Sequence, residues 1–395
     1  MPRYTIAAPA VLALVAGSLA VAAPAQALGT TIYTVAGDGT KGNTCGSGGS
    51  ATSAELNEPD GVAFNNSLLG LGIVYIADPK AEVVCQVNLL GGISVVAGTG
   101  AVGDSGDGGA ATSATLDWPE AVAYNNGFLY IADLGNNVVR QVDPSTGIIT
   151  TVVGDSVSGF SGDGSAADDA ELAYPTALAF DSSGDLFIAD SGNQRVREVV
   201  PDTAVAASLA IADGTISTVA GDGAEGDSGN DVTAISTPLA EPSGLAVNTV
   251  GGATYLYVSS PDANEVVQVN LSTGTLYDYA GDGTKGRTGD GGAATSAELN
   301  APHGLALDSS GDLYIADTGN SQVRVVDVST GDISLEAGYA DGALGYTGDD
   351  VAATDSKLFF PADVAISPLT GDLFIADTDN HRIRKVGLLD GIDLP

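Results

Sequence analysis

The chain is poor in positive charge. It has 13 Lys and Arg against 50 Asp and Glu in 395 residues, a formal net charge of −37. Nucleic-acid binding depends on clustered basic side chains that contact phosphates, so this composition excludes a nucleic-acid partner. Histidine and cysteine are also scarce, and the full set, which is His303, His381, Cys45 and Cys85, is too scattered for a tetrahedral zinc site. A lyase built on three zinc-binding histidines is excluded by the same count.

Long apolar runs are absent except at the N-terminus. Arg3 is followed by an almost wholly apolar stretch, residues 6–23, and by the small-residue cleavage signal Ala25-Gln26-Ala27. Residues 1–27 therefore have the pattern of a secretory signal peptide, with an uncleaved membrane anchor as the alternative. No later apolar run is long enough to span a membrane. We expect an exported protein, extracellular or at the cell envelope, with no transmembrane segment after signal cleavage.

What the chain does have is a repeat. A short apolar segment that ends in Ala-Gly or Val-Gly occurs six times, at residues 31–37, 93–98, 148–154, 216–221, 276–281 and 333–338. The period is about 60 residues, which is typical of propellers and other arrays of small sheets. Each unit contains four short apolar runs separated by turn-forming residues, and this pattern predicts a four-stranded antiparallel meander.

The first run of each unit is apolar on both faces and has Ala at its centre. Such a strand suits the innermost position of a sheet that packs between two neighbouring sheets. Six sheets of this kind, arranged radially, predict an all-β, six-bladed β-propeller over residues 28–390, followed by a tail at 391–395. A proline precedes each first run, and these repeat anchors are Pro59, Pro119, Pro175, Pro242, Pro302 and Pro361.

The sixth unit ends without its fourth strand. A surplus fourth strand, residues 31–36, stands at the other end of the propeller segment, before any first strand. We therefore expect residues 31–36 to pair with residues 382–386 and to close the ring by completing the last blade. An open ring would expose a sheet edge and lose radial packing.

Residues 371–384, Gly-Asp-Leu-Phe-Ile-Ala-Asp-Thr-Asp-Asn-His-Arg-Ile-Arg, resemble the signature of NHL repeats. The segment 280–299 is similar in particular to teneurin-type and bacterial secreted NHL arrays. The resemblance extends over the mature chain and implies a six-bladed propeller that serves as a scaffold for binding proteins or other ligands. It does not imply an enzyme, although some six-bladed relatives are lyases or hydrolases, and fold alone does not determine function.

An Asp, an Asn and an Arg of this signature recur in four of the six units. The complete sets are Asp133, Asn136 and Arg140; Asp190, Asn193 and Arg197; Asp317, Asn320 and Arg324; Asp377, Asn380 and Arg384. We interpret them as structural, because Asp and Asn hold tight turns and Arg pairs with carboxylates. Units one and four depart from the pattern, with Asp78, Ala81 and Cys85 in unit one and Ser260, Ala263 and Val267 in unit four.

Cys85 replaces the signature arginine in unit one, and Cys45 lies in the loop that leads into that unit. An exported chain meets oxidising conditions, so we predict a Cys45–Cys85 disulfide. If the signature arginine reaches toward the loop turn, the disulfide would replace that polar contact in unit one. Two free thiols are the alternative.

The loops between units are about 20 residues long, and loops of that length are often functional. Four of them carry an aspartate at a Gly/Asp turn: Asp107, Asp163, Asp290 and Asp349. Turn formation is one interpretation, and calcium binding by these carboxylates is the other. Calcium is the one candidate cofactor. The Ala-rich stretch that follows in each loop predicts one or two helical turns.

These loops share one face with the mouth of the central channel. Beside the anchoring prolines this face carries aromatic, acidic and histidine residues, which are our candidate ligand contacts: Trp118, Tyr174, Phe360, Glu120, His303, Asp60 and Asp363. The first hypothesis is an exported scaffold that binds a protein or cell-envelope ligand through this face. The competing hypothesis is a calcium-assisted hydrolase or lyase at the channel mouth, with carboxylates from Asp60, Glu120 and Asp363.

Overall fold

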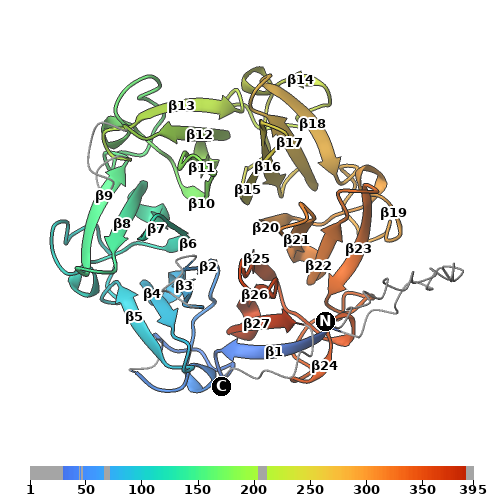
Figure 1. Cartoon of the computed structure of the whole chain (residues 1–395), viewed down its shortest axis with the longest axis horizontal. Coiled ribbons are helices and arrows are strands. Elements are labelled where there is room, and N and C mark those ends of the chain that lie inside the picture. The colour runs from blue at the N-terminus through green and yellow to red at the C-terminus, as the bar shows by residue number, and fades with distance from the viewer. Residues whose placement is uncertain (1–29, 44, 46–47, 66–71, 203–210, 388–395) are drawn as a thin grey trace, which may run out of the picture.

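Six small antiparallel sheets stand radially around a central axis (Figure 1). The computed structural model describes residues 30–43, 45, 48–65, 72–202 and 211–387. The predicted signal peptide, residues 1–27, and the predicted tail, residues 391–395, lie outside the described residues. The arrangement confirms the all-β, six-bladed β-propeller.

Each blade contains four main strands, which follow one another from the channel outward. Blade 1 has β2 (Val62–Phe64), β3 (Val74–Asp78), β4 (Val83–Val87) and β5 (Ile93–Ala97). Blade 2 has β6 (Pro119–Asn125), β7 (Phe128–Asp133), β8 (Val138–Asp143) and β9 (Ile148–Val153). Blade 3 has β10 (Pro175–Phe180), β11 (Leu186–Asp190), β12 (Arg195–Val200) and β13 (Thr215–Ala220).

The second half of the ring repeats this order. Blade 4 has β15 (Leu245–Val250), β16 (Ala253–Ser260), β17 (Glu265–Asn270) and β18 (Thr275–Ala280). Blade 5 has β20 (Pro302–Leu307), β21 (Leu313–Asp317), β22 (Gln322–Val326) and β23 (Asp332–Ala337). Blade 6 has β25 (Pro361–Ile366), β26 (Leu373–Asp377), β27 (Arg382–Gly387) and β1 (Thr31–Ala36).

Blade 6 closes the ring with a strand from the other end of the chain. In Figure 1 the blue β1 lies along the red β27. The register runs antiparallel from Thr31 opposite Gly387 to Ala36 opposite Ile383. The predicted closure by residues 31–36 is therefore confirmed.

The loop that leads from one blade into the next, which we call the entering loop, also covers the outer edge of the blade it enters. The short strands β14 (Val232–Thr233), β19 (Gly292–Ala293) and β24 (Val351–Ala352) pair with β18, β23 and β1. Blades 1 to 3 have single bridges at the same place, from Ser50, Ala110 and Ala166. Covering an edge in this way removes a template for unwanted strand pairing.

Each entering loop then forms one 3₁₀ turn, which is the helical turn expected for its Ala-rich stretch. These turns are η1 (Ala51–Ser53), η3 (Ala111–Ser113), η5 (Ala167–Asp169), η7 (Ala234–Ser236), η8 (Ala294–Ser296) and η10 (Ala353–Asp355). A second set lies between the second and third strands of five blades: η2 (Pro79–Ala81), η4 (Leu134–Asn136), η6 (Ser191–Asn193), η9 (Thr318–Asn320) and η11 (Thr378–Asn380). In the part of the chain that the structure describes, no helix has the length and apolar character needed to cross a membrane.

The apolar core is divided among the blade interfaces. Six buried clusters are present in the described residues, and each joins two neighbouring blades. Phe64 of blade 1, for example, meets Phe374 of blade 6 edge to face, with 4.5 Å between ring centroids. Because every blade is packed on both faces, the innermost strands are held rigidly around the channel.

Candidate functional site

A buried arginine ties the entering loop to the blade in blades 2, 3, 5 and 6. In blade 2, the Asp133 carboxylate at the end of β7 accepts hydrogen bonds from the Asp117 N–H at 2.8 Å and from the Asn136 amide at 2.9 Å. Arg140 on β8 lies 3.3 Å from Asp133 and donates to Asp107 of the entering loop at 2.5 Å. We call this set of two aspartates, one asparagine and one arginine the arginine clasp.

The other three clasps repeat this geometry. The arginine to loop-aspartate distances are 2.7 Å for Arg197 and Asp163, 2.8 Å for Arg324 and Asp290, and 3.1 Å for Arg384 and Asp349. In every clasp the arginine and the strand aspartate are completely buried, whereas the loop aspartate is partly exposed. Burial raises the pKa of Asp133, Asp317 and Asp377 to about 6, and the asparagine, the backbone N–H and the arginine oppose that rise.

The four loop aspartates of the clasps are also the residues predicted as possible calcium ligands. Each already faces a guanidinium group, which supplies the positive charge that its carboxylate needs. Among the described residues there is no group of three or more His, Cys, Asp or Glu side chains that could hold a metal ion. Calcium binding at these loops therefore stays a prediction, without a ligand set from these side chains.

Blade 1 replaces the clasp with a covalent link. Cys45 of the entering loop and Cys85 on β4 form a disulfide with 6.2 Å between the Cα atoms, and both residues are fully buried. The predicted disulfide is confirmed. Asp78 keeps the hydrogen bond from the Asn57 N–H at 2.9 Å, but its Oδ1 is buried without a partner in the described residues. Burial raises the pKa of Asp78 to about 7.

Blade 4 has neither clasp nor disulfide. Val267 and Ser260 stand where the arginine and the strand aspartate would be, and both are fully buried. The loop is held instead by Ser228, whose hydroxyl donates to Glu265 at 2.8 Å, and by Asn230, whose side-chain amide oxygen accepts the Asp278 N–H at 3.2 Å. Burial raises the pKa of Glu265.

The residue before each anchoring proline has a left-handed backbone, although none of the six is glycine. These residues are Glu58, Trp118, Tyr174, Glu241, Ala301 and Phe360, with φ between 47° and 62°. Such a conformation is strained for a side chain with a Cβ. Each N–H is bound by a side chain of the preceding blade; for example, Glu82 accepts from Trp118 at 2.6 Å and His381 accepts from Glu58 at 3.2 Å.

We call these six contacts the interblade latches. The remaining acceptors are Asn137, Gln194, Asn264 and Ser321, paired with Tyr174, Glu241, Ala301 and Phe360. These latches could not be predicted from the sequence, because the six acceptor residues share a side-chain acceptor atom but not a residue type. All six acceptor residues have left-handed backbones, with φ between 53° and 58°, and no sequence motif marks that conformation.

The latches determine where the predicted aromatic contacts lie. Trp118, Tyr174 and Phe360 are 38%, 54% and 40% exposed, and none of them lines the channel cavity. Trp118 nevertheless interacts with one of the predicted polar contacts, because a hydrogen bond from it lowers the pKa of the Glu120 carboxyl. The predicted aromatic contacts therefore lie outside the cavity, and Trp118 alone of the three is shown to interact with a residue that lines it.

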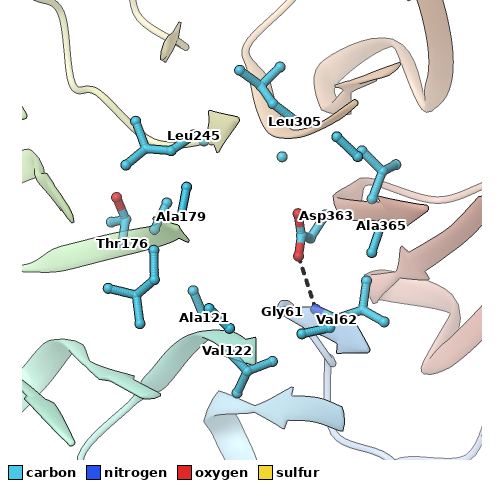
Figure 2. Close-up of a pocket in the computed structure, with 18 of the residues that line it drawn as sticks. Gly61, Val62, Ala121, Val122, Thr176, Ala179, Leu245, Leu305, Asp363 and Ala365 are labelled. Atoms are coloured by element: carbon cyan, nitrogen blue, oxygen red, sulfur yellow. Dashed lines mark hydrogen bonds between the residues drawn. The ribbon is translucent and has the colours of Figure 1, made fainter. Parts of the chain in front are cut away.

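A cavity of about 450 Å³ occupies the central channel between the six innermost strands. Asp60, Glu120, His303 and Asp363, the four polar residues predicted as ligand contacts, all line it. Figure 2 shows Asp363 pointing into the open space while its carboxylate accepts the Val62 N–H at 2.9 Å, with Thr176 on the far side. Apolar side chains such as Val122 and Leu305 form the wall.

Three carboxyl groups crowd one side of the cavity, at the end of the channel where the entering loops lie. Burial raises the pKa of Asp60 well above its usual range, and the charges of Glu120 and Asp363 add to the rise while a hydrogen bond from Thr378 opposes it. Burial likewise raises the pKa of Glu120 and of Asp363 to about 7. We call Asp60, Glu120 and Asp363 the acidic triad.

The other side of the same end is uncharged. Thr176, Ser243 and His303 occupy it, each directly after an anchoring proline. His303 Nδ1 lies 3.0 Å from the Ser243 hydroxyl, and burial lowers the pKa of His303 to about 4 against a small opposing effect of Asp262. The imidazole is therefore neutral at neutral pH.

Comparison with known proteins agrees with this architecture. The NHL repeat model matches residues 172–198 and 299–326, which lie in blades 3 and 5. NHL repeat-containing protein 2 of Bos taurus is 28% identical over 292 residues, 70% of this chain and 40% of that protein. Teneurin-3 of Danio rerio is 29% identical over 298 residues, 69% of this chain and 10% of that protein.

Solved structures share the fold at low identity. An auxiliary nutrient binding protein from Bacteroides thetaiotaomicron superposes with a TM-score of 0.63 at 15% identity, covering 91% of this chain and 76% of that one. A gluconolactonase from Xanthomonas campestris has a TM-score of 0.53 at 15% identity, covering 84% and 86%.

Six four-stranded blades around a polar channel define a β-propeller scaffold. The chain carries NHL repeats and is similar to NHL repeat-containing proteins and teneurins, as its signature residues predicted. The chain spans about 40% of the length of NHL repeat-containing protein 2 and about a tenth of the teneurins.

Proposed function

We propose that this propeller is a binding module whose loop-bearing face holds a ligand at the mouth of the central channel. The observation that carries the proposal is the cavity, where titratable side chains from four blades meet at one end. Asp60, Glu120, Asp363 and His303 all have displaced pKa values there. Clusters of such groups in a concave site are typical of functional sites.

The asymmetry of the channel mouth supports a single site. Identical blades would present six equivalent positions, whereas in this ring the acidic triad comes from blades 6, 1 and 2 and the uncharged residues come from blades 3, 4 and 5. One ligand orientation is therefore favoured over the other five. The exposed Trp118, Tyr174 and Phe360 stand before the same prolines and offer apolar contacts to a larger partner.

The proposed place of action is extracellular or at the cell envelope, and the proposed ligand is a protein or another envelope component. The buried Cys45–Cys85 disulfide supports this location, because disulfides persist in oxidising compartments. The large excess of carboxylates also keeps an exported protein soluble.

The test of this proposal is a variant in which a larger side chain fills the channel. A set of small polar compounds is screened for those that raise the thermal midpoint of the intact protein. Ala179→Phe places a ring in the cavity, whereas Ala179→Ser, the matched control, leaves the volume open. We expect ligands of the wild type to lose their stabilising effect on Ala179→Phe and to keep it on Ala179→Ser. Equal stabilisation of both variants would show that binding occurs elsewhere.

The second candidate is a hydrolase or lyase that uses the acidic triad with calcium. The displaced pKa values favour acid–base chemistry at this position. However, no three carboxylates of the described residues stand close enough to hold a metal ion, so the residues do not form a calcium site as they lie. Calorimetric titration with CaCl₂ separates the two candidates, since the enzyme hypothesis requires binding that Asp363→Asn removes.

A further inference from the structure

The channel cavity combines a one-sided charge with an apolar wall. The acidic triad lies at its loop-bearing end, and none of the described residues that line the cavity is Lys or Arg. Val62, Val122 and Leu305 form part of the cavity wall (Figure 2). A ligand that is complementary to both features has a positively charged group at one end and a hydrocarbon portion.

An incoming donor would satisfy a carboxylate oxygen that is now unpaired. Oε2 of Glu120 is buried and has no hydrogen-bond partner in the described residues, although Glu120 lines the cavity. Leaving a buried polar atom without a partner is costly. Asp363, by contrast, accepts the Val62 N–H through Oδ2.

The three carboxyl groups of the triad do not converge on one point. Metal coordination needs ligands gathered within about 2.6 Å of one point, and among the described residues no three carboxylates are gathered in this way. A primary ammonium group has three N–H donors, and charged hydrogen bonds to one or two carboxylates are enough to bind it. The cavity of about 450 Å³ also has room for an organic body.

We infer that the channel binds an organic cation, with a primary ammonium group at Glu120 and Asp363 of the acidic triad and its hydrocarbon part along Val62, Val122 and Leu305. The inference rests on the proposed function, because it names the ligand class of the same site. Neutral His303 on the opposite side does not repel the cation.

Proton release accompanies this binding. With pKa values of about 7 for Glu120 and Asp363, and a strongly raised one for Asp60, the empty triad holds protons at neutral pH. An ammonium ion favours the ionised carboxylates, so affinity rises as pH increases through about 7. Other groups also act on these pKa values. A hydrogen bond from Trp118 lowers the pKa of Glu120, while a hydrogen bond from Thr378 lowers and the charge of Asp78 raises the pKa of Asp60. Lys80 is a basic side chain whose charge interacts with that of Asp60.

The experiment is calorimetric titration of the whole protein with n-hexylammonium, benzylammonium and 1,6-hexanediammonium, each paired with the alcohol of the same skeleton. We expect at least one ammonium ion to bind about tenfold or more tightly than its alcohol, since one charged hydrogen bond contributes that much. Glu120→Gln and Asp363→Asn should each weaken binding about tenfold by the same reasoning. Glu241→Gln removes an exposed carboxylate from the same face, outside the cavity, and should leave affinity unchanged.

The outcomes separate the two proposals. Alcohols that bind as tightly as their ammonium ions, with both losing affinity in Ala179→Phe, would overturn the organic cation and leave the binding channel standing. Ca²⁺ binding that Glu120→Gln removes, without binding of any ammonium ion, would also overturn it. If none of the ammonium ions binds, the inference fails, whereas the proposed function is decided by the cavity-filling variant.

Discussion

Four blades hold their entering loops with the arginine clasp, and two opposite blades do so without it. Blades 2, 3, 5 and 6 place a fully buried arginine between two aspartates. Blade 1 joins loop to strand through the Cys45–Cys85 disulfide, and blade 4 through Ser228, Glu265 and Asn230. The loop keeps the same path in every blade because its backbone bridges recur, such as Gly98 N–H to Ala111 and Gly281 N–H to Ala294.

The arginine clasp is therefore one of three ways in which this protein holds the same loop against its blade. A buried ion pair offsets its own desolvation cost only when its geometry is good, and a well-packed apolar substitute can be equally stable. Val267 in blade 4 is such a substitute, since it packs in the cluster between blades 3 and 4. We expect the three arrangements to differ in how much stability the protein loses when each is removed by mutation, and this loss can be measured for each blade.

The largest effect is expected in blade 1. Replacing Cys45 and Cys85 with serine removes a cross-link between residues 40 positions apart, which should lower the free energy of unfolding by about 4 kcal/mol through the entropy of the unfolded chain. Denaturant titration of the double variant measures the loss. The wild type in reducing agent should approach the same value, and an unchanged midpoint would show that the disulfide does not secure this loop.

The next effect is expected in a clasp blade. Arg324→Ala leaves Asp317 buried without its cation and releases Asp290, so unfolding should become easier by about 3 kcal/mol. Val267→Ala at the equivalent place in blade 4 removes only packing and is the matched comparison. If the valine variant loses as much as the arginine variant, the ion pair has no special role.

A third prediction uses the same substitution in both kinds of blade. Asp78 has a pKa of about 7 when folded, against about 3.9 in an unfolded chain. The folded state thus binds its proton more tightly, so the stability contributed by Asp78 is complete below about pH 4 and is lost as pH rises through 7. Asp78→Asn should therefore stabilise the protein at pH 8 by on the order of 2 kcal/mol and change little at pH 4.

Asp133→Asn in blade 2 should give no comparable gain at pH 8. The pKa of Asp133 is raised only to about 6, because Asn136 and Arg140 oppose the effect of burial, and the substitution also leaves the buried Arg140 without the carboxylate that faces it. Thermal unfolding of both variants at pH 4, 6 and 8 makes the test. Loss of stability in both variants at pH 8 would mean that Asp78 is ionised and well paired.

The sequence predicted more of the fold than of the site. The period, the anchoring prolines and the displaced fourth strand were enough for six blades and their closure, because strand patterns are local. Replacement of arginine by Cys85 pointed to the disulfide for the same reason. The place of Asp60, Glu120 and Asp363 at the channel was also predicted, since they follow the prolines that begin the innermost strands, and their role in binding stays a prediction.

The aromatic residues were expected at the same mouth, and backbone conformation explains why they do not line the cavity there. Trp118, Tyr174 and Phe360 have left-handed backbones held by the interblade latches, so they are exposed on the surface and do not line the channel. That conformation depends on acceptors in the preceding blade, a contact 36 residues away in sequence for Trp118 and Glu82. Residue type alone carries no signal for it.

The smallest effect is expected from building a clasp into blade 4. The change combines Ser260→Asp, Ala263→Asn and Val267→Arg with Asn230→Asp, which reproduces the residues of blades 2, 3, 5 and 6. The new ion pair must offset the desolvation of two buried charges and the loss of the Val267 packing, so the net change should lie within about 1 kcal/mol of zero. Denaturant unfolding against Arg324→Ala is the measurement that matters, because removing a clasp and adding one are not inverse operations. A buried charge that loses its partner is penalised at once, whereas a new pair in blade 4 begins from a site with no buried charge, where Val267 is packed and only the Ser260 hydroxyl is without a partner among the described residues. A gain equal to the loss in Arg324→Ala would contradict this argument and would make the clasp itself a net source of stability.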